Sequence, residues 1–430
     1  MQLQNVLILG SGGREHAFAY KISQSKNIGN LFIAPGNAGT SEFGININIS
    51  ENDFESIKIA VLEKHISIVI VGPEMPLVKG IRNFFLNDEL LQNIAVIGPD
   101  KTGALLEGSK DFSKQFMIKY QIPTAAYQSF TKNNIEDGFI FLEKLNPPYV
   151  LKASGLAAGK GVLIIDNLNE AKNELSEMLN GMFGESSETV VIEEFLNGIE
   201  LSVFVLTDGL SYKILPTAKD YKRIGNDDTG LNTGGMGAIS PVPFADGSFM
   251  KKVEDEIIIP TINGLISEDI DYRGFLFIGL MNCNGQPKVI EYNCRMGDPE
   301  TEAVLPRIES DFLQHLIAVG NQTLKSEKIE ISNKTAATVV VASGGYPSNF
   351  EKGFEISLPI NEDGTIVFHS GTKLQNEKIL TNGGRVLAVT SLHDSIESAS
   401  KKSYETIKNI QFKNMYYRTD VGNDLLKYSN

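Results

Sequence analysis

The sequence predicts a multidomain protein of mixed α/β and α+β class that begins with a parallel-sheet domain. Its 430 residues exceed what a single hydrophobic core usually organises. The first hundred residues alternate short apolar runs with amphipathic stretches, which is typical of βα units. From Ser109 onward, β-rich runs and helical patterns follow without that alternation, which indicates α+β segments. We therefore expect domains at residues 1–100, 101–325 and 326–430.

Charge and composition argue against several classes of protein. The chain carries 39 basic and 53 acidic residues, a formal charge of −14, which disfavours a broad nucleic-acid or anionic-membrane surface. Its two cysteines, Cys283 and Cys294, are too few for a disulfide framework or a cysteine-rich zinc site. No apolar run approaches the roughly 20 residues of a membrane span, and no basic segment precedes the first run. We expect a cytoplasmic monomer that binds neither nucleic acid nor membrane.

The parallel sheet is predicted from four apolar runs, VLIL, LFIA, IVIV and IAVI, at residues 6–9, 31–34, 68–71 and 94–97. The loops that follow them begin GSGG, PGN, GPE and GPD, and ligands bind at the carboxyl ends of such strands. In GSGGREHA, Glu15 replaces the third glycine of a dinucleotide fingerprint, and no acid follows the second strand. This pattern argues against an NAD-dependent dehydrogenase. The first loop is either a phosphate site at a helix N-terminus or a tight turn that needs glycine.

A small insertion with two β-rich runs follows a helix that Ser109 can cap and that is expected to run to Pro123. The runs PYVLKASGLAAGKGVLII and TVVIEEFL flank the helical stretch NEAKNELSEMLNGM, which predicts a mobile lid at about residues 123–192. Its motif KASGLAAGKGV is not a P-loop, because no Ser or Thr follows the lysine. Glycines let a backbone close over phosphate oxygens and lysines add charge, whereas a plain hairpin turn needs neither in such number. The residues concerned are Lys152, Gly155, Gly159, Lys160 and Gly161.

Three further motifs are ambiguous by themselves. VVIEEFLNGIE ends a strand in Glu193 and Glu194 and carries Glu200 beyond them, but acids at a strand end are commonly only solvated. KDYKR, residues 219–223, gathers charged side chains into either a functional group or a surface cluster. The stretch GNDDTGLNTGGMG, residues 225–237, has five glycines in 13 residues and is either a mobile substrate loop or a linker.

The most informative motif is IEYNCRMGDPE, residues 290–300. In an extended chain successive side chains point to opposite faces, so Glu291, Asn293 and Arg295 would line one face. The apolar side chains between them, which would pack, are Ile290, Tyr292 and Cys294. Carboxylate and amide oxygens suit Mg²⁺, and a guanidinium can hold a phosphoryl or carboxylate oxygen. With Lys110 and Lys152, this pattern predicts ATP handling without a P-loop, by positioning and charge neutralisation.

Taken in order, the motifs resemble the ATP-grasp ligases, and within them the phosphoribosylamine-glycine ligase family. The resemblance runs through GSGGREHA, PGNAGT, VGPEMPL, LEGSKDFSK, KASGLAAGKGV, VIEEFL, LNTGGMGAISP, VIEYNCRMGDPET and SGGYP. It implies an N-terminal parallel-sheet domain, a mobile lid, a central ATP-grasp core and a small C-terminal domain. It also implies that ATP phosphorylates the carboxylate of glycine and that 5-phosphoribosylamine attacks the glycyl phosphate. The products would be glycinamide ribonucleotide, ADP and phosphate, in purine biosynthesis.

The resemblance also implies a role for each matching residue. Those expected at the ATP phosphates are Lys110, Lys152, Gly155, Gly159, Lys160 and Gly161. Those expected at the adenosine are Glu193, Glu194, Phe195, Leu196 and, at the ribose, Glu200. Glu291 and Asn293 would bind Mg²⁺ or Mn²⁺. Those expected at phosphoribosylamine are Gly12, Gly13, Arg14, Glu15, Asn37 and Glu74. Those expected to act in catalysis are Arg295, Asp220 and Asp298.

Some positions differ from the family pattern. Ser154 stands where the flap more often has Asp, Met296 where Phe is commoner, and KDYKR where QDHKR is commoner. The run GLM lacks the second acidic metal ligand of many ATP-grasp proteins, which leaves the number of bound metals open. Two alternatives remain. One is another ATP-grasp carboxylate-amine ligase of purine synthesis, and the other is a nucleotide-binding regulator without turnover, in which we would expect the metal pair to be lost.

Overall fold

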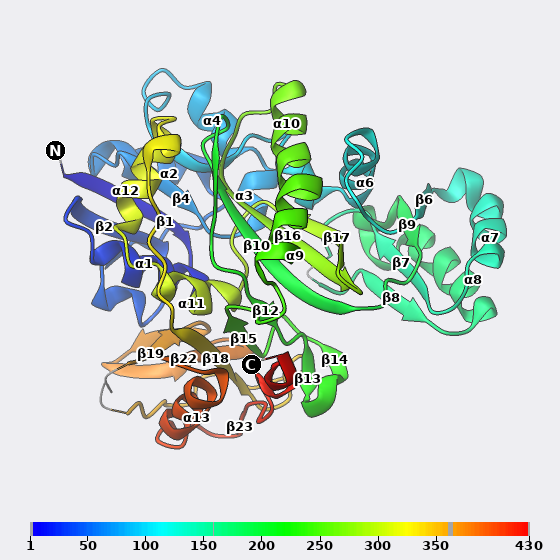
Figure 1. Ribbon diagram of the computed structural model, residues 1–430. Helices are drawn as coiled ribbons and strands as arrows, with labels where there is room; N and C mark the ends of the chain where they lie inside the picture. The colour runs from blue at the N-terminus through cyan, green and yellow to red at the C-terminus, as the bar shows by residue number, and fades with distance from the viewer. Residues whose placement is uncertain (1–2, 158, 360–363, 429–430) are drawn as a thin grey trace.

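The computed structural model describes residues 3–157, 159–359 and 364–428. An N-terminal parallel sheet adjoins a central antiparallel sheet, a lid stands to one side, and a further sheet lies at the C-terminal end (Figure 1). This arrangement confirms the predicted multidomain α/β and α+β fold. Ala158, in the middle of the flap motif, lies outside the described residues.

The N-terminal sheet contains all four predicted strands, in the parallel order β5-β4-β1-β2, with the short β3 at its edge. Their apolar runs are largely buried, which agrees with a parallel sheet covered on both faces. The strands are β1 (Gln4–Gly10), β2 (Ile28–Pro35), β3 (Ile45–Asn46), β4 (Ile68–Val71) and β5 (Ala95–Pro99). The helices between them are α1 (Gly13–Ser23), α2 (Phe54–Glu63), α3 (Glu74–Val78) and α4 (Ile81–Leu86). The predicted ligand loops therefore meet at one edge of this sheet.

The central antiparallel sheet is continuous with the N-terminal sheet. Tyr272 and Arg273 at the start of β16 pair with Pro99 and Gly98 of β5, and the rest of β16 runs between β10 and β17. One nine-stranded sheet therefore crosses the predicted domain boundary at residue 100. Its remaining strands are β10 (Ile199–Thr207), β11 (Tyr212–Ile214), β16 (Tyr272–Cys283) and β17 (Gln286–Asn293). The helices that pack on this part are α9 (Gly247–Val253) and α10 (Ile259–Ser267) (Figure 1).

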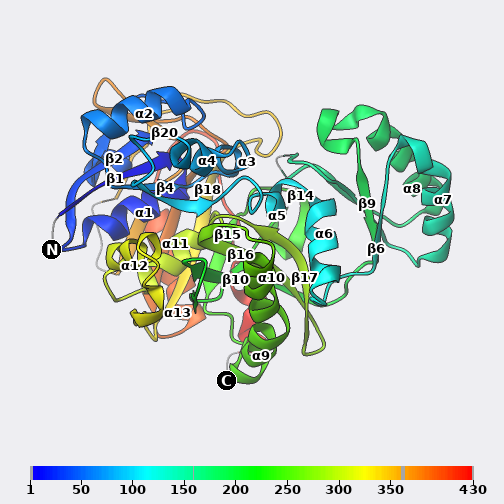
Figure 2. The same ribbon diagram turned by 90° about the horizontal axis from the view of Figure 1, so that it is seen from above.

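The lid is a separate antiparallel sheet in the order β6-β9-β7-β8, with two helices against it. Both views show it to one side of the other layers (Figure 1, Figure 2). It has an apolar core of its own, which includes Phe130, Leu151 and Leu175. Its strands are β6 (Tyr127–Phe130), β7 (Tyr149–Ala153), β8 (Val162–Ile165) and β9 (Val190–Glu193), and its helices are α7 (Ile135–Lys144) and α8 (Leu168–Glu177).

The helix before the lid begins as predicted but ends early. After the short α5 (Leu105–Gly108), Ser109 caps α6 (Lys110–Lys119) by accepting a hydrogen bond from the Phe112 N–H. The helix ends at Lys119 and does not reach Pro123, because Gln121 adopts a positive φ of 55° that turns the chain out of the helix.

The C-terminal sheet draws strands from two predicted domains. β12 (Lys219–Asp220) and β15 (Gly237–Ser240) join β18 (Thr335–Ser343), β22 (Arg385–His393) and β19 (Thr365–His369), with β23 (Met415–Tyr416) beside β18. This sheet crosses the predicted boundary at residue 325. The glycine-rich stretch between β12 and β15 is not a structureless loop, because β13 (Arg223–Gly225) and β14 (Thr229–Asn232) pair in it. The remaining elements are α11 (Glu300–Val304), α12 (Phe312–Gly320), β20 (Thr372–Gln375), β21 (Lys378–Thr381) and α13 (Ile396–Ile407).

Within the described ranges, none of the helices combines the length and the apolar composition needed to cross a membrane.

We predict that Gly274, at the junction of the two joined sheets, tolerates no side chain. Its φ is +150°, and a Cβ there would lie 2.8 Å from the Gly98 backbone nitrogen. Gly274→Ala should lower the free energy of unfolding by about 2 kcal/mol or more, measured by urea titration. Gly247→Ala is the matched control, because a Cβ at this helical position meets nothing within 4 Å and should be neutral or slightly stabilising. Equal effects of the two substitutions would contradict this account of the junction.

Candidate active site

Two lysines reach one carboxylate where the lid meets the helix before it. Lys152 on β7 places its Nζ 2.9 Å from Glu193 Oε1, and Lys114 on α6 places its Nζ 3.1 Å from Glu193 Oε2. All three side chains are buried. Lys110 lies four residues before Lys114 and so on the same face of α6. The sequence predicts Lys110, Lys152 and Glu193 as site residues, and the spacing from Lys110 was the only signal for Lys114.

Burial and charge act in opposite directions on these groups. Burial would raise the pKa of Glu193, but Lys152 and Lys114 outweigh it and hold that pKa below its ordinary value. Burial lowers the pKa of Lys114 to about 8, against the attraction of Glu193. Burial likewise lowers the pKa of Lys110, which Glu291 opposes. A bound anion would stabilise the ammonium forms, so the cluster favours an anionic ligand.

Glu291 and Asn293 lie on one face of β17, as the alternation predicts, opposite Gly279 and Phe277 of β16. Tyr292 lies on the other face, buried, with its hydroxyl oxygen 2.7 Å from Thr261 Oγ1. The alternation does not extend to Ile290, because a β-bulge leaves that residue without a partner on β16. It also stops at Asn293, where β17 ends, so the following loop places Arg295.

The carboxylate of Glu291 is surrounded by cations. Burial would raise its pKa, but Lys222, Lys152 and Lys110 outweigh it and lower that pKa. In the part of the chain that the structure describes, no group of three or more His, Cys, Asp and Glu side chains could hold a metal ion. The carboxylate and amide of Glu291 and Asn293 nevertheless fit Mg²⁺, which keeps several waters and takes substrate phosphates as ligands. These residues therefore suit a metal that arrives with a nucleotide.

Lys222 is part of this site and not only of a surface cluster. Its Nζ lies 2.6 Å from Glu200 Oε2, at the start of β10, and the two side chains are 45% and 40% exposed. Burial would lower the pKa of Lys222, but Glu200, Asp220 and Glu291 raise it well above its ordinary value. This solvent-accessible ion pair therefore links the KDYKR segment to Glu200, the residue that is predicted to hold the ribose.

Asp220, which is half-buried, interacts electrostatically with the buried Glu300. Burial, together with the nearby charge of Asp220, raises the pKa of Glu300 to about 7. Burial also raises the pKa of Asp220, against the attraction of Lys222. The Ser202 hydroxyl donates to Glu300 Oε1 at 3.1 Å. Glu300 follows a proline in GDPE, and no spacing in the sequence marks it as a partner of Asp220.

Arg295 is held by two acids. Its Nη2 lies 2.8 Å from Glu107 Oε1, and its Nε lies 3.5 Å from Glu74 Oε2. The same Nη2 is 3.4 Å from Asn293 Oδ1, so the guanidinium stays beside the predicted metal pair. The other oxygen of Glu107 accepts from the Cys294 N–H at 2.8 Å. Glu107 is a buried residue of α5, and nothing in the sequence points to this role.

Glu15 occupies the space at the end of β1. Its carboxylate accepts from the Gly12 N–H at 2.5 Å and from Arg14 Nε at 2.7 Å. A Cβ at Gly10 or Gly72 would collide with this side chain. The glycines of the first loop therefore have a packing reason, and a carboxylate already occupies one N–H group of the expected phosphate site. Arg14 donates through Nη1 to the Met296 carbonyl at 3.1 Å.

Gly13, Asn37 and Asp298 tie the N-terminal loops to other parts of the chain. Asn37 donates to the Ser11 and His369 carbonyls at 2.9 and 2.8 Å, and its Oδ1 accepts from the Gly39 N–H. Gly13 packs against Glu302 of α11. Asp298 Oδ1 lies 3.0 Å from Nη1 of Arg385 on β22. The contacts of Gly12, Gly13, Arg14, Glu15, Asn37 and Glu74 with a substrate stay predictions.

The remaining predicted residues lie on the lid and its hinge. In the flap, the Gly155 N–H donates to the Ser186 carbonyl at 2.9 Å, Gly161 is buried, and Gly159 and Lys160 are exposed. At the hinge, Glu194 pairs with Lys288 at 3.1 Å, Leu196 is half-buried and Phe195 is exposed. The structure thus brings Lys110, Lys152, Glu193, Glu200, Glu291, Asn293 and Arg295 together and leaves Lys160 and Phe195 at the surface.

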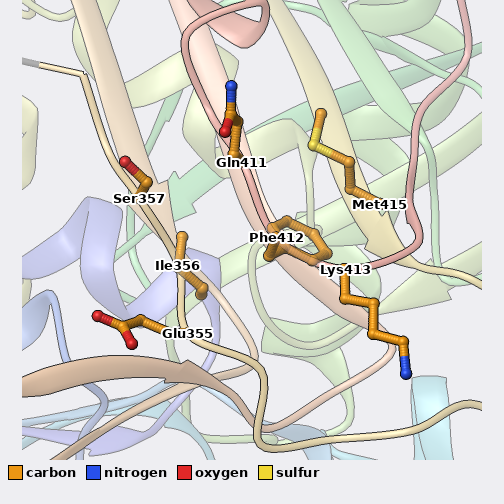
Figure 3. A pocket seen from close by; sticks show the side chains of 7 residues that line it. All are labelled: Glu355, Ile356, Ser357, Gln411, Phe412, Lys413 and Met415. Atoms are coloured by element: carbon orange, nitrogen blue, oxygen red, sulfur yellow. The ribbon is translucent and has the colours of Figure 1, made fainter.

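A surface hollow of about 730 Å³ lies elsewhere, between two C-terminal segments. Figure 3 shows Glu355, Ile356 and Ser357 on one segment, and Gln411, Phe412, Lys413 and Met415 on the other. None of the predicted site residues lines it, so the charged cluster beside the lid remains the candidate active site.

A lid sheet beside a central antiparallel sheet, with lysines, a carboxylate and an amide gathered between them, is the arrangement of an ATP-grasp protein. The family model described as "Phosphoribosylglycinamide synthetase, ATP-grasp (A) domain" matches residues 108–301. Those of the N and C domains of the same synthetase match residues 4–107 and 336–424. The chain therefore belongs to the phosphoribosylglycinamide synthetase family of ATP-grasp ligases.

Relatives agree over almost the whole chain. A phosphoribosylamine–glycine ligase of Fusobacterium nucleatum is 46% identical, over 97% of this chain and 98% of that protein. The bifunctional purine biosynthetic protein PUR2,5 of Pichia angusta is 45% identical over 99% of this chain, which spans 54% of that longer protein. The crystal structure of the phosphoribosylamine–glycine ligase of Thermotoga maritima has a TM-score of 0.85 and 38% identity, covering 97% of this chain and 99% of that one.

We predict that Glu193→Gln destabilises the fold. The substitution leaves Lys114 and Lys152 buried without their charge partner, which should cost about 3 kcal/mol of unfolding free energy, measured by urea titration. Glu194→Gln is the matched control one residue away. Its pair with Lys288 is 38% and 35% exposed, so the loss should stay below about 1 kcal/mol. A larger loss for Glu194→Gln than for Glu193→Gln would overturn the assignment of the buried pair.

We predict that Glu300 makes stability fall as the pH rises. Because burial and Asp220 raise its folded pKa from 4.5 to about 7, its contribution is fully present below about pH 4.5 and is lost as the pH rises through 7. Glu300→Gln keeps an oxygen for Ser202 but cannot ionise. As the pH rises from 5 to 8, the unfolding free energy of the parent should therefore fall relative to that of the variant. The change in this difference should be at most on the order of 3 kcal/mol. Parallel stability curves over this range would contradict the raised pKa.

Proposed function

We propose that the protein joins glycine to 5-phosphoribosylamine with ATP, giving glycinamide ribonucleotide, ADP and phosphate in purine biosynthesis. The observation that carries this proposal is the convergence of Lys110, Lys152 and Glu291, from three separate elements, beside the lid. Such a group suits a triphosphate with its metal. Relatives that match nearly the whole chain are named phosphoribosylamine–glycine ligase, which supports the choice of substrates.

The reaction takes two steps. An oxygen of the glycine carboxylate attacks the γ-phosphorus of ATP, and ADP leaves, which forms glycyl phosphate. The amine of 5-phosphoribosylamine then attacks the carbonyl carbon, loses a proton, and phosphate leaves. Lys110 and Lys152 would hold phosphate oxygens, and Arg295, beside Asn293, would neutralise charge on the transferred group. A divalent ion bound by Glu291 and Asn293 would neutralise further charge on the triphosphate.

The lid would exclude water from glycyl phosphate, which water can hydrolyse. Its separate apolar core supports movement as one body, because few of its packing contacts would have to break. The glycine-rich flap, with Gly155, Gly159, Lys160 and Gly161, would close over the phosphates. The hinge residues Glu193 to Leu196 would meet the adenine, and Glu200 would hold the ribose.

The N-terminal loops would receive 5-phosphoribosylamine. The N-terminus of α1 with Arg14 supports a phosphate there, since its dipole favours an anion. Asp220 and Asp298 would act at the amine and carboxylate of the substrates. A cytoplasmic location, a monomeric state and the choice between Mg²⁺ and Mn²⁺ stay predictions.

The direct test is ADP release with ATP, Mg²⁺, glycine and 5-phosphoribosylamine, each omitted in turn. Full release should require every component, and glycinamide ribonucleotide should appear in step with ADP. Turnover with a different carboxylate or amine in place of these substrates would favour another ATP-grasp ligase of purine synthesis. Nucleotide binding without turnover on any substrate would favour a regulator.

We predict that Glu291→Gln lowers turnover by at least about a hundredfold, or some 2.7 kcal/mol of barrier, because it removes the charge that faces the metal and triphosphate. Folding should survive, since the two side chains have the same shape. Tyr292→Phe is the neighbouring control on the packed face, where only a hydroxyl contact with Thr261 is lost. It should keep most of the turnover in a steady-state assay. The reverse result would show that the chemical face of β17 is misassigned.

A further inference from the structure

The two faces of the KDYKR segment contact different parts of the protein. On one face, Lys219 Nζ lies 3.2 Å from Asp424 Oδ2, and the Tyr221 hydroxyl donates to Asp424 Oδ1 at 2.6 Å. The same hydroxyl accepts from the Gly422 N–H at 2.9 Å. Tyr221 and Lys219 are buried, and the Lys219 ammonium lies 3.9 Å from the centroid of the Tyr221 ring. This face is therefore held by the last residues of the chain.

The side chains on the other face of the segment, Asp220 and Lys222, lie beside the candidate active site. Lys222 Nζ lies 2.6 Å from Glu200 Oε2, and Asp220 is close enough to Glu300 to affect its ionisation. Successive residues of an extended segment point to opposite sides, so the neighbours of Tyr221 in the chain, Asp220 and Lys222, lie on the other face. A shift of the Tyr221 backbone therefore moves both of them. The position of the Lys222 ammonium therefore depends on how firmly Tyr221 is held.

More contacts from the same C-terminal segment hold the hairpin that follows. Arg418 is 1% exposed, donates to the Arg223 carbonyl at 3.2 Å and pairs with Asp228 at 2.7 Å. Asn226 and Thr419 exchange two hydrogen bonds, at 2.7 and 3.1 Å. Residues 416–424, which we call the C-terminal clasp, thus fix the stretch that the sequence leaves open as a mobile loop or a linker.

We propose that Tyr221 and Asp424 are positioning residues of the nucleotide site, which act by holding Lys222 against Glu200. The C-terminal clasp thereby completes a site whose ligands come from the lid and the central sheet. This inference rests on the proposed function, because it takes Glu200 as a group that binds the nucleotide. A pair that only stabilised the fold would leave nucleotide affinity unchanged in molecules that remain folded.

The test compares Tyr221→Phe with Ser403→Ala in the full chain. Tyr221→Phe removes the hydroxyl that joins Asp424 and Gly422. Ser403→Ala removes another buried hydroxyl, which donates to the Ala337 carbonyl of β18 at 2.8 Å and contacts neither Tyr221 nor Asp424. Affinity for a non-hydrolysable ATP analogue with Mg²⁺ is measured by titration calorimetry, and unfolding is measured by urea. The KM values for ATP and glycine follow from ADP release.

Tyr221→Phe should weaken binding of the analogue at least about fivefold and raise the KM for ATP by a similar factor. Ser403→Ala should change only the unfolding curve. Lys222→Met should weaken binding about tenfold, and Tyr221→Phe should add little in the double variant, because both act through the same ammonium. Asp424→Asn, which can still accept from Tyr221, should retain more affinity than Asp424→Ala.

Three results would overturn the proposal. They are unchanged nucleotide affinity in Tyr221→Phe, equal losses in Tyr221→Phe and Ser403→Ala, or full additivity with Lys222→Met. The calorimetric arm needs no turnover, so it separates this inference from the proposed reaction. A parent protein that binds the analogue but shows no glycine-dependent ADP release would contradict the reaction and leave the positioning test intact.

Discussion

The candidate site depends on the balance of charge in a small volume. Five cations, from four separate parts of the chain, would repel one another if they were brought together alone; they are Lys110 and Lys114 on α6, Lys152, Lys222 and Arg295. Carboxylates compensate them, with Glu193 between two lysines, Glu200 beside Lys222 and Glu107 beside Arg295. The cations are therefore held in place before any ligand binds, which reduces the reorganisation that a charged substrate requires.

The fold could be predicted where the pattern of side chains has a direct physical cause. The four apolar runs of the N-terminal sheet are strands because they are covered on both faces, and Ser109 begins a helix because its hydroxyl satisfies a free N–H group. The pattern fails where the backbone departs from a regular period. Gln121 ends α6 with a positive φ, and the bulge at Ile290 interrupts the alternation of side chains along β17. Neither glutamine nor isoleucine is a residue type from which such a conformation could be predicted.

The site residues could likewise be predicted only where a local pattern determines their position. Glu291 and Asn293 could be placed together because a strand alone determines that they share a face. Glu107, Glu300 and Arg385 were missed because their partners lie far away in the sequence, and only the tertiary fold brings them near. The first loop shows a different limit. Its glycines indicate close approach, but the side chain that approaches is Glu15 in the first turn of α1, so glycine alone does not distinguish packing from ligand binding.

The pairing of β15 with β18 has a consequence for the order in which this protein matures during synthesis. β12 and β15 leave the ribosome about a hundred residues before β18, their neighbour in the finished sheet, and still earlier than the segment that contains Arg418. The N-terminal sheet can begin to form before β18 is available to pair with β15. A nascent chain that is released early would thus carry the folded N-terminal loops and the lysines of the lid, yet lack the framework that fixes the segment between β12 and β15. Residues 416–424 must therefore emerge from the ribosome before that segment can take its final position.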